Sequence, residues 1–410
     1  MKKILLLGAA AMLSLSVNAQ VEKVWMVNAS ETQTVTVRGA TGYGESVFTL
    51  DQTAGTVEEW KDAAKVATFE VNKFCADNNL GEEIEVEEIN GTDTTTVKKF
   101  QPYVIWTCAM TDDAGNIMVG VGTGAGSAAT CQNFVLLPVS DRKAMQLLHV
   151  DELPSGVKPG RMDIPRRMIG DVAGDGAYMF ITPNGANIML VAFVGLDDDG
   201  KIYYDVENSW PLLSGVAFDS QTCVGSFQTV AEILDAQTED EVAAKTYLRW
   251  RGQGAPFTWN AEAAQFEKNT SMKNGAGAAG MDVVKIGDVE YMVVPAKAGN
   301  GNRGCSVEVY NLATNELAGS FDAESATDVY ECSIIAQPTA DGKSAYIYVS
   351  AKAQAFGLLK FTPGASAIES IAADANAPVE YYNLQGVKVA KAENGLFIKK
   401  QGNKAVKVVL

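Results

Sequence analysis

The segment 247–259 holds the residues best suited to bind a ligand. It combines two tryptophans, a phenylalanine and two arginines with glycines and a proline. Aromatic faces stack on sugars and other rings, and guanidinium groups donate hydrogen bonds to polar groups. The alternative interpretation is a strand with packed tryptophans followed by a glycine turn. The candidate ligand-binding residues are Arg249, Arg251, Phe257 and Trp259.

Strand alternation assigns different roles to the two tryptophans. On a strand, Arg249 and Arg251 share one face and Trp250 lies on the other. Burying two arginines is costly, so the sequence predicts a packed Trp250 and exposed arginines. Trp259, beyond the turn, is then the expected ligand contact, with both arginines as its polar partners.

A second basic group lies at Lys158–Arg161 with Arg166 and Arg167. Such an island in an acidic protein can bind an acidic group. The favoured interpretation is a solvated loop whose charges balance nearby acids.

Enzymatic signatures are scarce, and the sequence favours a non-catalytic protein without assigning catalytic residues. The single histidine, His149, excludes metal sites built from several histidines, and no G-x-S-x-G or P-loop motif occurs. Fifty acidic residues leave glycoside hydrolysis by paired carboxylates open, but they do not locate it. Asp197–Gly200 resembles a calcium loop only superficially, because the acids do not alternate as required and no terminal glutamate follows. A hairpin turn is predicted there, with calcium as a weak alternative and no other metal or cofactor.

Composition narrows the class of protein. The chain has 410 residues, 33 basic and 50 acidic side chains and a net charge of −17. This charge argues against nucleic-acid binding, which needs a basic surface, and against docking on an anionic membrane. Hydrophobic residues make up 47% of the chain, a share typical of globular proteins.

Short runs of β-branched and aromatic residues, separated by polar turns, dominate the sequence between residues 20 and 361. Turns recur at Gly115, Gly176, Gly287 and Gly342, which are 61, 111 and 55 residues apart. The doubled middle interval predicts a degenerate unit around 217–280. A unit of about 55 residues with four antiparallel strands has the size of a propeller blade. The sequence therefore predicts an all-β, propeller-like body of about six four-stranded units, with tandem β-sandwiches as the alternative.

Three segments depart from this pattern. Val57–Leu80 and Val230–Lys245 are each compatible with a short helix, and Glu82–Lys99 reads as a charged hairpin turning at Asn90 and Gly91. The six cysteines are widely and irregularly spaced, which favours buried thiols over disulfides.

The first 19 residues form a predicted signal peptide. A basic start at Lys2 and Lys3 precedes an apolar run from Ile4 to Val17, and small residues precede the expected cleavage between Ala19 and Gln20. Signal peptidase and the secretion machinery are thus expected partners. No later stretch is apolar enough to span a bilayer.

The tail begins after a small-residue linker at 362–378 and carries three ordered motifs. These are Tyr382-Asn383-Leu384-Gln385-Gly386, then Gly395-Leu396-Phe397-Ile398, then a basic terminal strand from Lys404. In order and position they resemble the C-terminal sorting domain of type IX (Por) secretion substrates. The resemblance implies a small β-sandwich-like sorting domain at 379–410 and passage through the periplasm and the outer membrane. An ordinary terminal hairpin is the alternative.

Taken together, the sequence predicts an exported, non-catalytic binding or scaffold protein outside the cell or on its surface. An extracellular glycan, peptide or protein is the expected partner. A secreted glycan hydrolase and a structural surface component are the alternatives.

Overall fold

The computed structural model describes two compact units, Gln20–Pro363 and a C-terminal one that begins at Gly364. Within them the structure describes residues 20–28, 39–123, 133–149, 167–250, 255–272, 279–298, 301–323, 332–351, 354–364, 379–383, 388–389, 396–401 and 404–409.

The described residues of the first unit form six four-stranded antiparallel sheets, here called blades 1 to 6 in chain order, together with one two-stranded hairpin and three short helices. Blade 1 contains β2 (Ala40–Tyr43), β3 (Ser46–Asp51), β4 (Thr56–Lys61) and β5 (Ala64–Phe69). Blade 2 contains β8 (Val104–Thr111), β9 (Ile117–Gly122), β10 (Asn133–Leu137) and β11 (Gln146–His149). Blade 3 contains β12 (Met168–Asp171), β13 (Gly176–Ile181), β14 (Ile188–Leu196) and β15 (Ile202–Leu213).

The second half of the body repeats this arrangement. Blade 4 contains β16 (Cys223–Ser226), β17 (Thr246–Arg249), β18 (Phe257–Asn260) and β19 (Gln265–Lys268). Blade 5 contains β20 (Asp282–Ile286), β21 (Val289–Ala298), β22 (Gly301–Asn311) and β23 (Leu317–Phe321). Blade 6 contains β24 (Cys332–Pro338), β25 (Ala345–Ala351), β26 (Ala355–Thr362) and, as its fourth strand, β1 (Gln20–Asn28).

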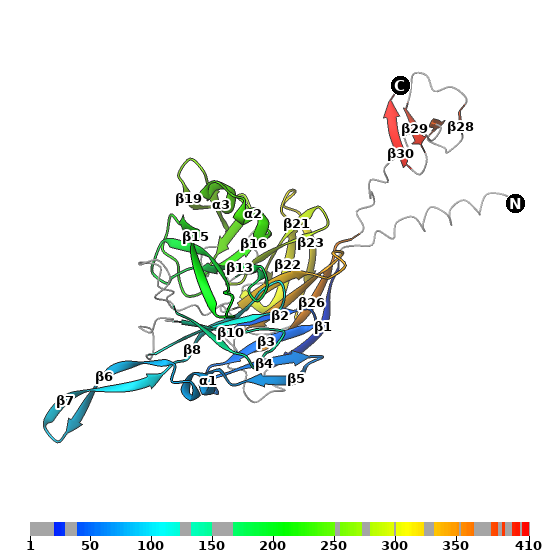
Figure 1. Cartoon of the computed structure of the whole chain (residues 1–410). Coiled ribbons are helices and arrows are strands. Elements are labelled where there is room, and N and C mark those ends of the chain that lie inside the picture. The colour runs from blue at the N-terminus through cyan, green and yellow to red at the C-terminus, as the bar shows by residue number, and fades with distance from the viewer. Residues whose placement is uncertain are drawn as a thin grey trace. The chain divides into compact units, whose positions relative to one another are not determined.

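The blades close into a ring, so the body is a β-propeller. β1 pairs with β26 from Gln20 opposite Thr362 to Asn28 opposite Ala355, and Figure 1 shows the blue first strand beside the orange last one. The first strand of blade 1, β2, contacts both β8 and β24, and β20 contacts both β16 and β24. Such contacts between first strands, together with the paired ends, exclude the alternative of tandem sandwiches. The sequence prediction of six four-stranded units is confirmed.

Stacking of blades explains why the middle strands have no polar face. All six residues of β9 and of β13 are buried, because neighbouring blades cover both sides of each sheet. One core cluster joins blades 2 and 3 through Met110, Met118 and Met179, and another joins blades 3 and 4 through Tyr178 and Trp250.

The predicted repeat of turns marks one edge of the ring. Gly115, Gly176, Gly287 and Gly342 all lie at the turn between the first and second strands of a blade, with positive φ. In blade 4 two helices, α2 (Val230–Leu234) and α3 (Glu239–Ala243), replace that turn. This insertion accounts for the doubled interval and confirms the predicted helical segment.

The other helix prediction is only partly right. Residues 57–69 form strands, and the helix predicted at Val57–Leu80 is limited to α1 (Val71–Asp77). The hairpin prediction is correct: β6 (Gly81–Asn90) and β7 (Asp93–Pro102) pair over their full length and extend away from the blades in Figure 1.

The C-terminal unit holds one antiparallel sheet in the order β28, β27, β29, β30. Its strands are β27 (Val379–Tyr382), β28 (Lys388–Val389), β29 (Leu396–Gln401) and β30 (Lys404–Val409). Tyr382 ends β27 and Asn383 follows it, while Phe397 and Ile398 lie in β29. The other motif positions, Leu384, Gly386 and Gly395, lie outside the described residues, as does Ala19.

The cysteines follow the prediction of buried thiols where the structure describes them. Cys75 and Cys305 are free and buried, and Cys223 and Cys332 are also buried. Cys131 lies outside the described residues, and nothing is described of the Cys108 side chain.

Candidate functional site

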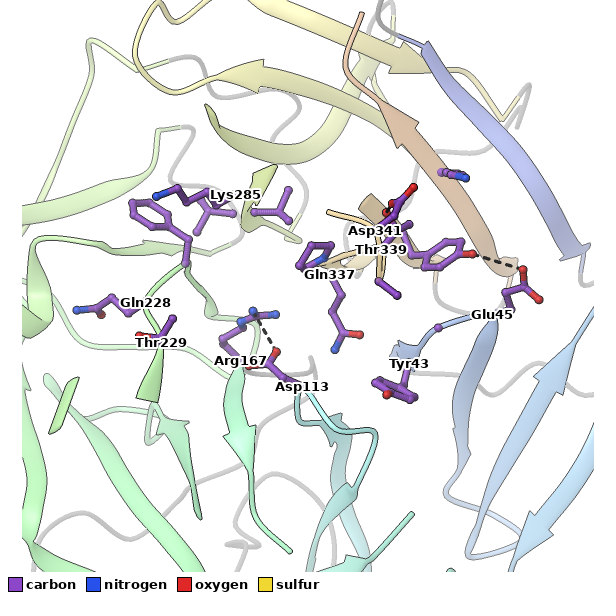
Figure 2. A pocket seen from close by; sticks show the side chains of 18 residues that line it. Tyr43, Glu45, Asp113, Arg167, Gln228, Thr229, Lys285, Gln337, Thr339 and Asp341 are labelled. Carbon is purple, nitrogen blue, oxygen red and sulfur yellow. Dashed lines mark hydrogen bonds and ion pairs between the residues drawn. The ribbon is translucent and has the colours of Figure 1, made fainter. Parts of the chain in front are cut away.

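A cavity of about 730 Å³ opens at the edge of the ring where the first strands of the blades end. This volume falls within the range of roughly 300–1,000 Å³ typical of small-molecule sites. Every blade contributes to its lining, and Figure 2 shows the side chains converging. The contributors in blade order include Tyr43, Asp113, Arg167, Gln228, Lys285 and Gln337.

Arg167 is the most deeply held charged group of this cavity. Its side chain is 7% exposed and immediately precedes β12. Nη1 donates to the carbonyl of Ala336 at 3.3 Å and lies 3.8 Å from Oδ2 of Asp282, while Nη2 lies 3.5 Å from Oδ1 of Asp113. Among the described residues, Nε has no hydrogen-bond partner. The guanidinium is therefore held by two carboxylates at ion-pair distance and keeps most of its donors unused.

Asp282 supports Arg167 from the side of blade 5. It is completely buried, and its two oxygens accept the backbone N–H groups of Val283 and Ala336, both at 2.8 Å. Burial raises the pKa of this carboxyl to about 6, although Arg167 and the two N–H groups act in the opposite direction. The bonds of Asp282 also join blades 5 and 6.

Asp113 is held in place by the turn that follows β8. Its backbone N–H donates to the carbonyl of Gly170 at 2.9 Å, and its Oδ2 accepts the N–H of Gly170 at 2.8 Å. The preceding residue, Asp112, is fully buried and accepts from Val172 N–H at 2.9 Å and from the Asn116 amide at 2.7 Å. Burial raises the pKa of Asp112 to about 6. This network fixes blade 2 to blade 3 and leaves the Asp113 side chain 41% exposed at the cavity.

Aromatic side chains form part of the cavity wall. Tyr43 ends β2, and Tyr346 on β25 donates its hydroxyl to Oε1 of Glu45 at 3.4 Å (Figure 2). Gly115 lies beneath Tyr43: with φ of +95°, a Cβ there would approach Cδ1 of Tyr43 to 2.5 Å. A side chain at position 115 would therefore displace the ring.

The remaining charges around the cavity are mixed in sign. Glu45 and Asp341 are acidic, whereas Lys285 and Lys360 are basic. Asp341 accepts the Thr339 hydroxyl at 2.6 Å and the Lys343 N–H at 3.1 Å, and these bonds lower its pKa. Mixed charges beside aromatic rings fit a polar ligand.

The predicted binding segment is arranged differently from the expectation. The prediction of a packed Trp250 is confirmed, since it is 3% exposed and stacks on Phe257 with ring centroids 4.2 Å apart. The prediction of an exposed Arg249 is wrong: this residue is fully buried and donates from Nη1 to the carbonyl of Gly280 at 2.7 Å. Blade 5 covers the face of β17 that simple alternation assigns to solvent. Phe257 is likewise buried, so neither Phe257 nor Arg249 presents a surface to a ligand.

Trp259 is partly exposed on β18. Its indole N–H donates to Oδ1 of Asp240 at 2.5 Å, and its ring meets Phe266 edge-on. Arg251 lies outside the described residues. None of the described residues of 247–259 lines the cavity.

Sequence reasoning missed the main residue of the site. Arg167 was expected in a solvated loop, yet it is buried, while 158–161 and Arg166 lie outside the described residues. A usable signal was present, because Arg167 directly precedes the apolar start of β12 at Met168 and Ile169. In the structure Arg167 lies at the start of this strand and lines the cavity.

The Asp197–Gly200 segment forms the turn between β14 and β15. Asp197 accepts the N–H groups of Asp199 and Lys201 at 3.0 and 2.7 Å, the arrangement of a hairpin turn. Among the described residues, no group of three or more His, Cys, Asp or Glu is placed to hold a metal. No helix among these residues is long and apolar enough to cross a membrane.

Comparisons with known proteins add little to this description. No protein-family model matches the chain, and no curated protein matches it. Among solved structures, dihydro-heme d1 dehydrogenase NirN in complex with DHE is similar at a TM-score of 0.32 and 10% sequence identity, over 84% of this chain and 79% of that chain. This likeness is too weak to bear on function.

Proposed function

We propose that the protein is an exported, non-catalytic binding protein that holds an extracellular glycan or peptide in the cavity described above. The observation that carries the proposal is Arg167, a buried guanidinium with unused donors that lines the cavity beside a half-exposed carboxylate. Burying such donors without full hydrogen bonding costs free energy, and a polar ligand would recover it.

Binding is favoured over hydrolysis by the pKa and the accessibility of two carboxyl groups, those of Asp341 and Asp282. A general acid needs a raised pKa and access to the substrate. Asp341 lines the cavity, but its pKa is lowered. Asp282 has the raised pKa, but it is completely buried and its oxygens already accept backbone N–H groups.

Export is proposed from the two ends of the chain. Cleavage after Ala19 would leave Gln20, the first residue of β1, at the mature N-terminus, so the strand that closes the ring would remain intact. The C-terminal sheet forms a unit separate from the propeller, which suits a role as a sorting domain.

Binding is tested by screening the purified chain on glycan and peptide arrays and by assaying each hit for cleavage products. We expect binding without turnover, and Tyr43→Ala should weaken it. Tyr203→Ala, a tyrosine on β15 that does not line the cavity, is the matched control. Turnover of a glycan would support the hydrolase alternative instead.

Export is tested by sequencing the N-terminus of the secreted protein and by deleting residues 379–410. We expect a start at Gln20 and, after the deletion, folded propeller retained in the periplasm. A secreted product that keeps Met1 would refute the signal peptide, and unchanged secretion of the deletion variant would refute the sorting role.

A further inference from the structure

We infer that the ligand is an uncharged saccharide, and that two adjacent hydroxyl groups of one sugar ring bind across Arg167 and Asp113. This inference rests on the proposed function, because it concerns the same cavity. The proposed function allows a glycan or a peptide and names no ligand contacts, whereas this inference names the ligand class and two contacts.

The donors come from Arg167. A guanidinium carries five N–H donors, and within the described part of the chain Arg167 makes one hydrogen bond, from Nη1 to the carbonyl of Ala336. The carboxylates of Asp113 and Asp282 lie at 3.5 and 3.8 Å, and Nε has no partner among the described residues. Figure 2 shows the guanidinium beside Asp113 in the cavity. A buried arginine so weakly hydrogen-bonded points to acceptor atoms supplied by a ligand.

The acceptor comes from Asp113. Its Oδ2 accepts the N–H of Gly170, whereas the one contact of its Oδ1 with the described residues is the long one to Nη2 of Arg167. A hydroxyl group both accepts and donates a hydrogen bond. One hydroxyl can therefore accept from Nη2 while its neighbour donates to Oδ1. Nη2 of Arg167 and Oδ1 of Asp113 lie 3.5 Å apart, a spacing that two adjacent hydroxyls can bridge.

Charge argues against an anionic ligand at this point. Arg167 already faces two carboxylates, so a third one would be repelled by Asp113. A neutral diol uses the donor and the acceptor without adding charge. The rings of Tyr43 and Tyr346 on the wall suit the apolar face of a sugar.

The test compares three probe panels on the purified full-length chain: neutral oligosaccharides, uronate-containing oligosaccharides, and peptides with acetylated and amidated ends. Binding of each is measured by calorimetry for wild type, Arg167→Lys, Asp113→Asn, Tyr43→Ala and Lys268→Gln. Asp113→Asn keeps an oxygen for Gly170, so it should fold, and thermal denaturation checks this. Lys268→Gln changes an exposed charge on β19, outside the cavity, and serves as the matched control.

We expect the neutral panel to bind, with affinity reduced about 10- to 100-fold by Asp113→Asn and by Arg167→Lys, as for the loss of a hydrogen bond to a charged group. Lys268→Gln should change the affinity less than about threefold, as a solvated charge does. Binding confined to uronates or peptides, and weakened by Tyr43→Ala, would overturn the saccharide inference and leave the binding cavity standing. Binding that none of the cavity variants affects, or no binding by any panel, would overturn both.

Discussion

Two buried arginines of this propeller, Arg167 and Arg249, have opposite surroundings. Arg249 is sealed between blades 4 and 5, where it donates to the Gly280 carbonyl near the thiols of Cys223 and Cys332, and burial lowers its pKa to about 10. Arg167 is almost as deeply buried, but it lies between two carboxylates and lines a cavity. Burial alone thus does not make an arginine part of a site. The acids and the opening beside Arg167 distinguish a binding position from a packing one.

The largest effect is expected from Arg167→Ala. At pH 7.5 it leaves the Asp282 carboxylate buried without its cation, so the free energy of unfolding should fall by about 3–5 kcal/mol. At pH 5 the carboxyl takes up a proton, because its pKa in the folded state is raised, and most of that loss should vanish. Urea unfolding at both pH values measures this. An equal loss at the two values would contradict the assigned pair.

Arg249→Ala should lower the free energy of unfolding by about 2–4 kcal/mol, because it opens a void and leaves the Gly280 carbonyl without its donor. In contrast to Arg167→Ala, the loss should be similar at pH 5 and pH 7.5. Arg249→Met, which refills the space without a buried charge, should recover all but about 1 kcal/mol. If Arg249→Met were as unstable as Arg249→Ala, the charge itself would be essential.

Asp282→Asn tests the ion pair of Arg167 and Asp282 by changing its acidic partner. A carboxyl with a raised pKa in the folded state stabilises the fold fully below its unfolded pKa of 3.8, and this stabilisation is lost as the pH rises through about 6. Wild type should therefore lose stability between pH 4 and pH 6, with Asp112 adding to the slope. Asp282→Asn should roughly halve that slope, removing about 2 kcal/mol of pH dependence. An unchanged slope in the pH series of unfolding curves would refute the raised pKa. Asp288→Asn, in the exposed turn after β20, is the control.

The smallest effect is expected from Trp259→Ala. The side chain is partly exposed and loses one hydrogen bond and one edge-on ring contact, so stability should fall by about 1 kcal/mol. If the cavity is the binding site, the affinity of Trp259→Ala for the ligand should stay within about twofold of the wild-type value. The sequence alone predicts instead a loss of about 1–3 kcal/mol in binding, as for an interface anchor. Titration of an array hit against both proteins decides between the two sites.

The architecture could be predicted from the sequence, whereas the position of the site could not. Glycine turns and apolar strands recur with the period of the blades, so the local sequence pattern predicts the fold. The doubled interval between the turns at Gly176 and Gly287 also predicts the blade that carries the inserted helices. The site depends on which side chains meet across blades, such as Arg167 from blade 3 with Asp113 and Asp282 from blades 2 and 5. Alternation along β17 gave the wrong face for Arg249, because blades, unlike a lone sheet, are covered on both sides.

The pairing of β1 with β26 sets the order in which the molecule can be completed. The final blade combines the first strand of the body with strands that lie at its far end, so it cannot form until synthesis has passed residue 362. Contacts this distant in the sequence make ring closure slow relative to the hairpins within each blade. The first strand of a nascent chain therefore stays unpaired, and the ring stays open, until synthesis has passed residue 362.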